Sequence, residues 1–128
     1  MADAGDNTIT FSFERLEAYK QAKILVKEIY KLQSRFPKEE KYALGDQVRR
    51  AAASITANIA EGCGRNSNKE KARFIEIAFG SMTEVFSELQ IAQDLEYITE
   101  DDFNQLRPYF TQLARILSGL RNSLSTEK

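Results

Sequence analysis

The sequence predicts an all-α protein folded as an antiparallel up-down-up-down four-helix bundle. Apolar residues recur three and four positions apart in four long segments, and no segment alternates apolar and polar residues as a strand would. Only two prolines and six glycines occur among 128 residues, which favours long uninterrupted helices. Short connections between such helices place consecutive helices antiparallel. We expect a flexible tail over residues 1–11, one bundle domain over 12–124 and a frayed end over 125–128.

The first helix is expected to begin with Ser12 as its N-cap. Phe11 and Leu16 have the spacing of a hydrophobic staple around that serine. The apolar periodicity then continues to Phe36. Because the residue before a proline avoids the helical conformation, Phe36-Pro37 should end this helix.

The second helix is expected to begin near Gly45 or Asp46 and to end at Gly62. Glycine is common just after the last helical residue, because it can take the left-handed conformation there. Gly62 and Gly64 are therefore predicted to end this helix in that way.

The third and fourth helices each begin with a recognisable cap. Ser67 followed by Glu70 three positions later is a capping box, and Thr99 with Asp102 repeats the pattern. Acidic residues in a first turn also suit the helix dipole. Pro108 lies inside the fourth helix and is expected to kink or divide it.

Composition points to a cytoplasmic protein. No apolar run approaches the roughly 20 residues that a membrane span needs, and the acidic N-terminal residues do not resemble a signal peptide. Cys63 is the only cysteine, so it cannot form an internal disulfide, which fits a reducing compartment. We expect no membrane partner.

The net charge of −1 conceals an uneven distribution. No lysine or arginine lies between Phe74 and Leu106, whereas eight acidic residues do, and most basic residues come earlier in the chain. Such asymmetry suggests an anionic partner at one end or a neighbouring subunit of opposite charge. Alternatively, both runs are ordinary solvated helix faces.

The absence of histidine argues against an enzyme. Histidine is the usual general base near neutral pH and a common metal ligand, so histidine-dependent nucleophile pairs and helical di-iron sites are excluded. Glu84 and Glu88 could bind a metal, but with no third ligand near them they are expected to face solvent or basic residues. We expect no catalytic residue, metal or cofactor.

Two groups of basic residues are candidates for binding the phosphates of RNA or DNA. The turn cluster, expected to gather where the second helix meets the third, comprises Arg49, Arg65, Lys69, Lys71 and Arg73. The lysine row, expected along one face of the first helix, comprises Lys20, Lys23, Lys27 and Lys31. The turn cluster is the first candidate, because the lysine row could equally be a solvated face.

A polar stripe is expected on the second helix among small residues. It comprises Arg50, Ser54, Asn58 and Glu61. The favoured interpretation is a structural network, in which Arg50 pairs with an acid of another helix and Asn58 bonds a backbone group. Direct ligand binding is the alternative.

Several strings of residues together resemble a known family. They include Phe36-Pro37, Gln47-x-x-Arg50-Ala51, Ser54-Ile55, Asn58-Ile59-Ala60-Glu61-Gly62, Gly64-Arg65 and Ala78-x-Gly80-Ser81. The pattern resembles the four-helix-bundle 23S rRNA-intervening-sequence proteins, also called S23 ribosomal proteins, from about Phe13 to Leu120. Members are bacterial, and no established biochemical activity accompanies the family name.

That family is similar to the accessory variability protein of diversity-generating retroelements, a barrel-shaped homopentamer with a positive surface. The resemblance implies a homo-oligomer, expected to be a pentamer. It also implies binding to ribosomal or retroelement-type RNA or DNA, or to a reverse-transcriptase-like or other nucleic-acid enzyme. The alternative is a purely structural or protein–protein interaction module that binds no nucleic acid.

Overall fold

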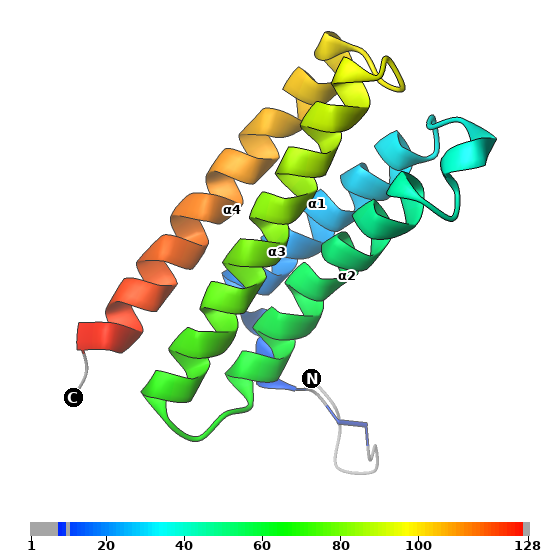
Figure 1. Ribbon diagram of the computed structural model, residues 1–128. Coiled ribbons are helices and arrows are strands. Elements are labelled where there is room, and N and C mark those ends of the chain that lie inside the picture. Colours follow the sequence, from blue (N-terminus) through cyan, green and yellow to red (C-terminus); the bar gives the residue numbers. More distant parts are fainter. Residues whose placement is uncertain (1–7, 10, 127–128) are drawn as a thin grey trace.

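Four antiparallel helices form the molecule (Figure 1). The computed structural model describes residues 8, 9 and 11–126. The helices are α1 (Glu17–Gln33), α2 (Leu44–Cys63), α3 (Asn68–Asp94) and α4 (Glu100–Thr126). Each helix packs against its neighbours in the chain and α4 closes against α1, while no Cα atoms of diagonally placed helices lie within 8 Å of each other. The predicted all-α up-down-up-down bundle is confirmed, and the described residues contain no strand.

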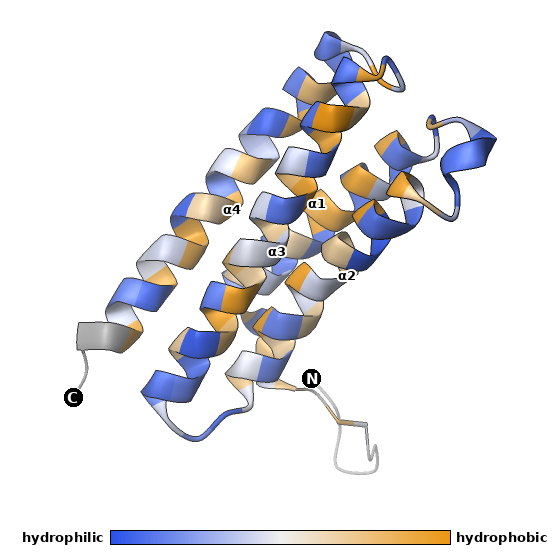
Figure 2. Cartoon of the chain, in the orientation of Figure 1, coloured by the Kyte–Doolittle hydropathy of each residue, from blue (hydrophilic) through white to orange (hydrophobic). Residues whose placement is uncertain are grey.

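One apolar stripe of each helix faces the centre of the bundle. Figure 2 shows hydrophobic positions along the inner faces and hydrophilic positions outside. In α1 the buried stripe has spacings of three and four and comprises Ala18, Ala22, Leu25, Ile29 and Leu32. Burying such stripes supplies most of a bundle's stability, since helix propensity alone is weak.

The first helix begins later than predicted. Residues Ser12–Arg15 form a short 3-10 helix, the backbone at Leu16 is extended, and α1 starts after it. Ser12 is therefore not the N-cap of α1, and its hydroxyl lies 3.4 Å from the Cys63 sulfur. The Phe13 ring packs edge-on against Tyr19 at 4.7 Å, and Leu16 packs on the core. These contacts favour the bend over a continuous helix.

At the other end, α1 stops at Gln33, three residues before Phe36. Another short 3-10 helix, Lys38–Glu40, lies in the connection to α2.

The turn between α2 and α3 differs from its prediction in one respect. No glycine in the described part of the chain has a positive φ, and Gly64 has φ −90°. Gly62 instead permits close packing, because a Cβ added there would lie 2.7 Å from Phe74 Cβ. Ser67 caps α3 as predicted, accepting a hydrogen bond from the Glu70 amide at 3.1 Å.

The predicted cap of α4 is confirmed in both directions. The Thr99 hydroxyl accepts from the Asp102 amide, and Asp102 accepts from the Thr99 amide, each at 3.0 Å. Of the two effects predicted at Pro108, division is wrong, because α4 continues through it, and a kink stays a prediction. Proline has no backbone N–H, so the Asn104 carbonyl lacks the helical hydrogen bond that residue 108 would normally donate. Asn104 and Pro108 are both exposed, so water can reach that carbonyl.

The domain boundaries expected from the sequence stay a prediction. The backbone stays helical through residues 125 and 126, two residues beyond the expected end of the bundle at 124. Residues 1–7, 10, 127 and 128, which belong to the expected tail and frayed end, lie outside the described residues.

Candidate nucleic-acid interface

The structure places four of the five turn-cluster residues near the α2–α3 turn but not the fifth. Arg65 lies in the turn, and Lys69, Lys71 and Arg73 lie in the first two turns of α3. Arg49 precedes Arg65 by 16 positions, which on a continuous helix is about 24 Å along the axis. The prediction that Arg49 joins this cluster is wrong, because uninterrupted α2 carries it to the opposite end of the bundle.

Arg49 instead fixes the connection between α1 and α2. Its guanidinium donates to Gln33 Oε1 at 2.9 Å and to the Lys41 carbonyl at 2.7 Å. Its own carbonyl accepts from the Tyr30 hydroxyl at 3.4 Å. With its donors engaged by the protein, this side chain has a structural role.

The arginines that remain in the turn cluster have partners within the protein. Arg65 forms an ion pair with Glu61, and its guanidinium lies 4.6 Å from the centre of the Phe74 ring. Arg73 lies 5.8 Å from the same ring and 4.0 Å from Glu70. Two of the four cations therefore have acidic neighbours that reduce the positive field offered to a phosphate.

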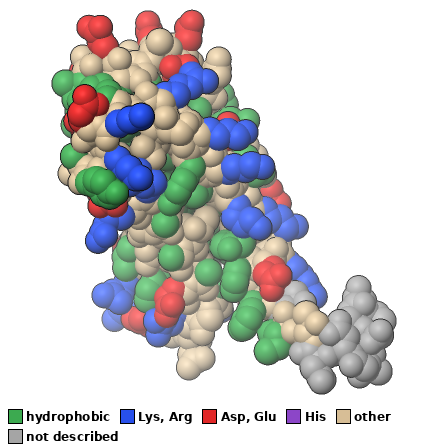
Figure 3. Space-filling model, turned by 90° about the vertical axis from the view of Figure 1, so that its right-hand side faces the viewer, with side chains coloured by type: hydrophobic (Ala, Val, Ile, Leu, Met, Phe, Trp, Pro, Cys, Tyr) green, Lys and Arg blue, Asp and Glu red, His purple; other side chains and the backbone are tan. Residues whose placement is uncertain are grey.

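The lysine row is more open. All four of its lysines are exposed along α1, and Lys20 to Lys31 spans about 16 Å of helix axis. Figure 3, a view turned by 90° from Figure 1, shows lysine and arginine side chains in a row along one edge of the face that it draws. Lys31 lies 3.4 Å from Glu28, and the Lys23 amine lies 5.6 Å from the Tyr19 ring centre. No described carboxylate lies within ion-pair distance of Lys20 or Lys27.

The middle of the predicted polar stripe joins two helices. The Ser54 hydroxyl lies 2.8 Å from the Ser81 hydroxyl of α3. Asn58 donates to the Ser54 carbonyl at 2.8 Å and to its hydroxyl at 2.9 Å. Both α2 residues are half-buried, so these bonds satisfy polar groups within the α2–α3 packing.

The ends of the stripe are exposed and pair locally. Arg50 lies 3.8 Å from Asp46 of its own helix. The prediction that it pairs with an acid of another helix is therefore wrong. Glu61 pairs with Arg65 one turn later. Both contacts span four residues, and the Arg50–Asp46 pair has the spacing that brings side chains together on one helix face.

Glu88 is buried, contrary to the expectation that it faces solvent or basic residues. Its side chain lies in α3 with 7% relative exposure, and its Oε1 atom is buried without a hydrogen-bond partner, while Glu84 is exposed. Burial, a hydrogen bond to Glu84 and that neighbour's charge raise the pKa of Glu88 from 4.5 to about 7. The four-residue spacing was visible in the sequence, but the burial depends on how α3 packs against its neighbours.

Two further kinds of feature, a metal site and a membrane span, are not found among the described residues. Among them, no three histidine, cysteine, aspartate or glutamate side chains are grouped so that they could hold a metal ion. None of the described helices is long and apolar enough to cross a membrane.

Comparison with known proteins supports the fold and identifies the family. A crystal structure of a protein of unknown function from the S23 ribosomal protein family of Bacteroides thetaiotaomicron aligns with a TM-score of 0.74 and 22% identity. The alignment covers 81% of this chain and 97% of that one, and at this identity it supports the fold alone. No curated protein gives a significant match. The sequence pattern of the 23S rRNA-intervening sequence proteins matches residues 14–119. This chain therefore belongs to the 23S rRNA-intervening sequence protein family.

Proposed function

We propose that this protein is a non-enzymatic, self-associating helical bundle that binds the phosphates of RNA or DNA through the lysine row of α1. The observation that carries the proposal is the exposure of four lysines along about 16 Å of one helix. Lys20 and Lys27 lack a carboxylate partner among the described residues, so their charge is available to an incoming phosphate. The relation to retroelement proteins stays a prediction.

The lysine row replaces the turn cluster as the first candidate. Arg49 is distant from that cluster, and Arg65 and Arg73 are partly neutralised by Glu61 and Glu70. A cation that already has an acidic neighbour gains less from a phosphate, because the existing pair must be broken or shared.

Binding of this kind should show little sequence preference. Lysines on a helix surface contact phosphates, which position a nucleic acid without reading its bases. Tyr30, the aromatic residue beside Lys31, has its hydroxyl held by the Arg49 carbonyl, so its ring is restrained rather than free to stack on a base. The family name refers to an intervening sequence of 23S rRNA and names no binding partner, so the proposal stands on the lysine row.

Exposed apolar residues support the self-association in this proposal. Ile77, Ile91 and Leu95 of the α3 segment are 39%, 48% and 53% exposed. Ala53 and Ala57 are exposed on α2, where short side chains allow another helix to approach. We expect a pentamer. Sedimentation velocity at tens of micromolar protein, an ordinary affinity range, would contradict self-association by showing only monomer.

The nucleic-acid proposal is tested by the salt dependence of binding to a labelled structured RNA and to duplex DNA. The test variant is Lys20→Gln with Lys27→Gln, and the matched control is Arg65→Gln with Lys69→Gln, which removes the same charge from the turn cluster. Fluorescence anisotropy between about 50 and 200 mM salt gives the slope of log affinity against log salt. Removing one phosphate contact should reduce that slope by about 1, so the lysine-row variant should show a slope smaller by about 2.

Each outcome separates the candidates. A larger reduction in the Arg65 and Lys69 variant would move the contact to the turn cluster. If the wild-type protein binds neither nucleic acid at the lowest salt while sedimentation shows an oligomer, the structural or protein–protein alternative is correct.

A further inference from the structure

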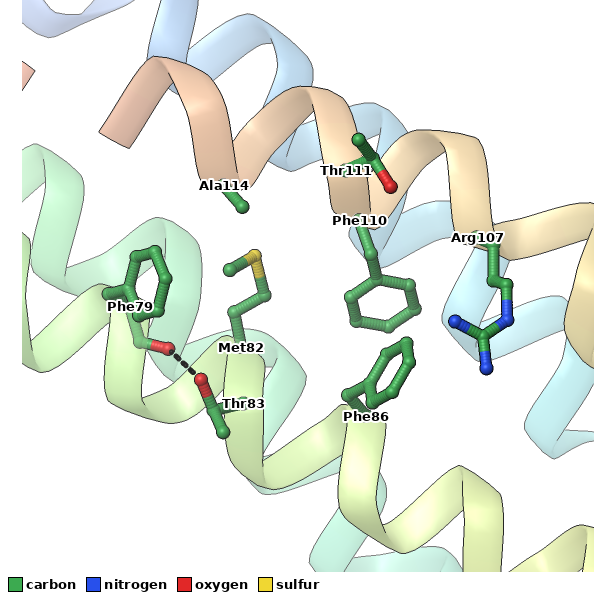
Figure 4. Close-up of a pocket in the computed structure, with 8 residues that line it drawn as sticks. All are labelled: Phe79, Met82, Thr83, Phe86, Arg107, Phe110, Thr111 and Ala114. Atoms are coloured by element: carbon green, nitrogen blue, oxygen red, sulfur yellow. Dashed lines mark hydrogen bonds between the residues drawn. The ribbon is translucent and has the colours of Figure 1, made fainter. Parts of the chain in front are cut away.

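A small apolar groove lies between α3 and α4, away from the lysine row. Figure 4 shows Phe79, Met82 and Phe86 on α3 facing Phe110 and Ala114 on α4. The groove has a volume of about 240 Å³. The Phe86 and Phe110 rings meet edge to face with centres 5.1 Å apart, an arrangement that fixes both rings.

A single positive charge stands at one end of this groove. The Arg107 guanidinium lies 5.1 Å from the centre of the Phe86 ring and 5.2 Å from that of Phe103. The rings orient the cation, and no described carboxylate lies within ion-pair distance of it. Asp94 and Glu100 line a separate polar hollow that also includes Arg107. Their negative charge would disfavour a ligand that carries more than one negative charge.

The shape of the groove indicates a small molecule rather than a docking helix. Met82 and Phe110 are buried, and Phe79, Phe86 and Ala114 are half-buried, so no large apolar side chain of the groove is broadly exposed. A helix-binding surface normally presents such side chains to its partner. A cavity of about 150 Å³ holds benzene, so this groove has room for one aromatic ring and a short chain.

We propose that the groove binds a small hydrophobic monocarboxylate, with its apolar body between α3 and α4 and its carboxylate on Arg107. An apolar cavity with one convergent charged group is the usual form of a site for such an amphipathic ligand. A guanidinium and a carboxylate can form two parallel charge-assisted hydrogen bonds, which would fix the ligand's direction. This site is independent of the proposed nucleic-acid contact, which lies on α1.

Met82 provides a direct measurement. The chain has only two methionines, so protein labelled with ¹³C at the methionine methyl groups gives two signals, and Met1 serves as the internal reference. We would titrate the protein with phenylpropionate and with phenylpropanol, which has the same body without the charge. The Met82 signal should shift saturably with phenylpropionate, and the alcohol should bind roughly tenfold more weakly, the usual effect of losing one charge-assisted hydrogen bond.

Three variants locate the site. Arg107→Gln should remove the preference for the carboxylate, and Ala114→Leu should abolish binding of both compounds by filling the groove. Arg115→Gln, which removes an exposed cation of the same helix outside the groove, should change nothing. The proposal is overturned if the Met82 signal shows no saturable shift or if both compounds bind the wild-type protein equally. It is also overturned if Arg115→Gln weakens binding as much as Arg107→Gln. Both substitutions alter exposed residues, so neither requires the core to repack.

Discussion

Replacing Glu88 with glutamine should make the stability of this protein less sensitive to pH. The carboxyl of Glu88 is buried in α3, one oxygen lacks a hydrogen-bond partner, and Glu84 lies one turn away. Burial, the hydrogen bond to Glu84 and that neighbour's charge together raise its pKa to about 7 in the folded protein. Glutamine keeps the shape of the side chain but cannot ionise.

The direction of the effect follows from proton linkage. Glu88 holds its proton in the folded state up to about pH 7, while the unfolded chain releases it near the ordinary value of 4.5. The favourable contribution of the protonated form is therefore complete below about pH 4.5 and is lost as the pH rises through about 7. The difference between these pKa values corresponds to about 3 kcal/mol of unfolding free energy, which is an upper bound for a group at the edge of the core.

Urea unfolding followed by circular dichroism at a fixed protein concentration measures this contribution. At pH 5 the wild type and Glu88→Gln should have similar stability, and above pH 8 the variant should be more stable by up to about 3 kcal/mol. Glu84→Gln is the informative second variant, because it removes the neighbouring charge but leaves Glu88 buried. It should move the pH dependence of stability to lower pH without removing it.

A stability difference between wild type and Glu88→Gln that is the same at pH 5 and above pH 8 would refute this reasoning. Such a result would mean that Glu88 does not change its protonation between these pH values in the folded protein.

Two further substitutions test the helix packing and the caps. Gly62→Ala should destabilise the protein by about 1–3 kcal/mol, because the new Cβ would meet Phe74 Cβ at 2.7 Å. Gly80→Ala, where nothing lies within 4 Å of the new Cβ, should stabilise it by up to about 1 kcal/mol, and equal melting temperatures for both variants would contradict the packing argument. Thr99→Ala should cost about 1 kcal/mol in urea unfolding at neutral pH. In the wild type, the hydrogen bond from the Thr99 amide is the main cause that lowers the pKa of Asp102, so protonation of Asp102 should weaken the α4 cap only in acid. If the cost of Thr99→Ala and the stability of the wild type stay unchanged in strong acid, that assignment is contradicted.

Features set by neighbouring residues were predictable from the sequence. The caps at Ser67 and Thr99 are local hydrogen bonds between residues three positions apart, so their pattern identifies them before the chain is folded. The four apolar stripes depend on helical period alone and predicted the bundle. Long segments and short connections then left few alternatives for its topology.

Features set by tertiary packing were not predictable. Ser12 has a capping residue's chemistry, but Phe13 and Leu16 pack where a bend is required and α1 begins after them. Gly62 looked like a helix stop, and only its distance to Phe74 shows that it permits close packing. Glu88 carried no sequence signal for burial, since helical periodicity places it at the edge of the apolar face.

The candidate site illustrates the same difference. Arg49 and Arg65 were predicted to lie in one cluster although most of α2 stands between them. Because α2 is unbroken, it places them at opposite ends of the bundle. Arg107 was overlooked because its significance depends on Phe86 and on the absence of a described carboxylate within ion-pair distance, neither of which sequence spacing shows.

The charges of this bundle are separated in a way that affects every binding experiment. The lysine row lies on α1 and four of the eight acidic residues on α3, the helix diagonal to α1, while three others lie on α4. Among the described residues, no ion pair within one copy joins the lysine row to these acidic residues, so its positive face stays open to any anion that approaches. A phosphate backbone and the acidic face of another copy would both satisfy that description, and added salt weakens either contact. A salt slope is consequently specific to nucleic acid only when the size of the assembly is measured at the same salt and found unchanged.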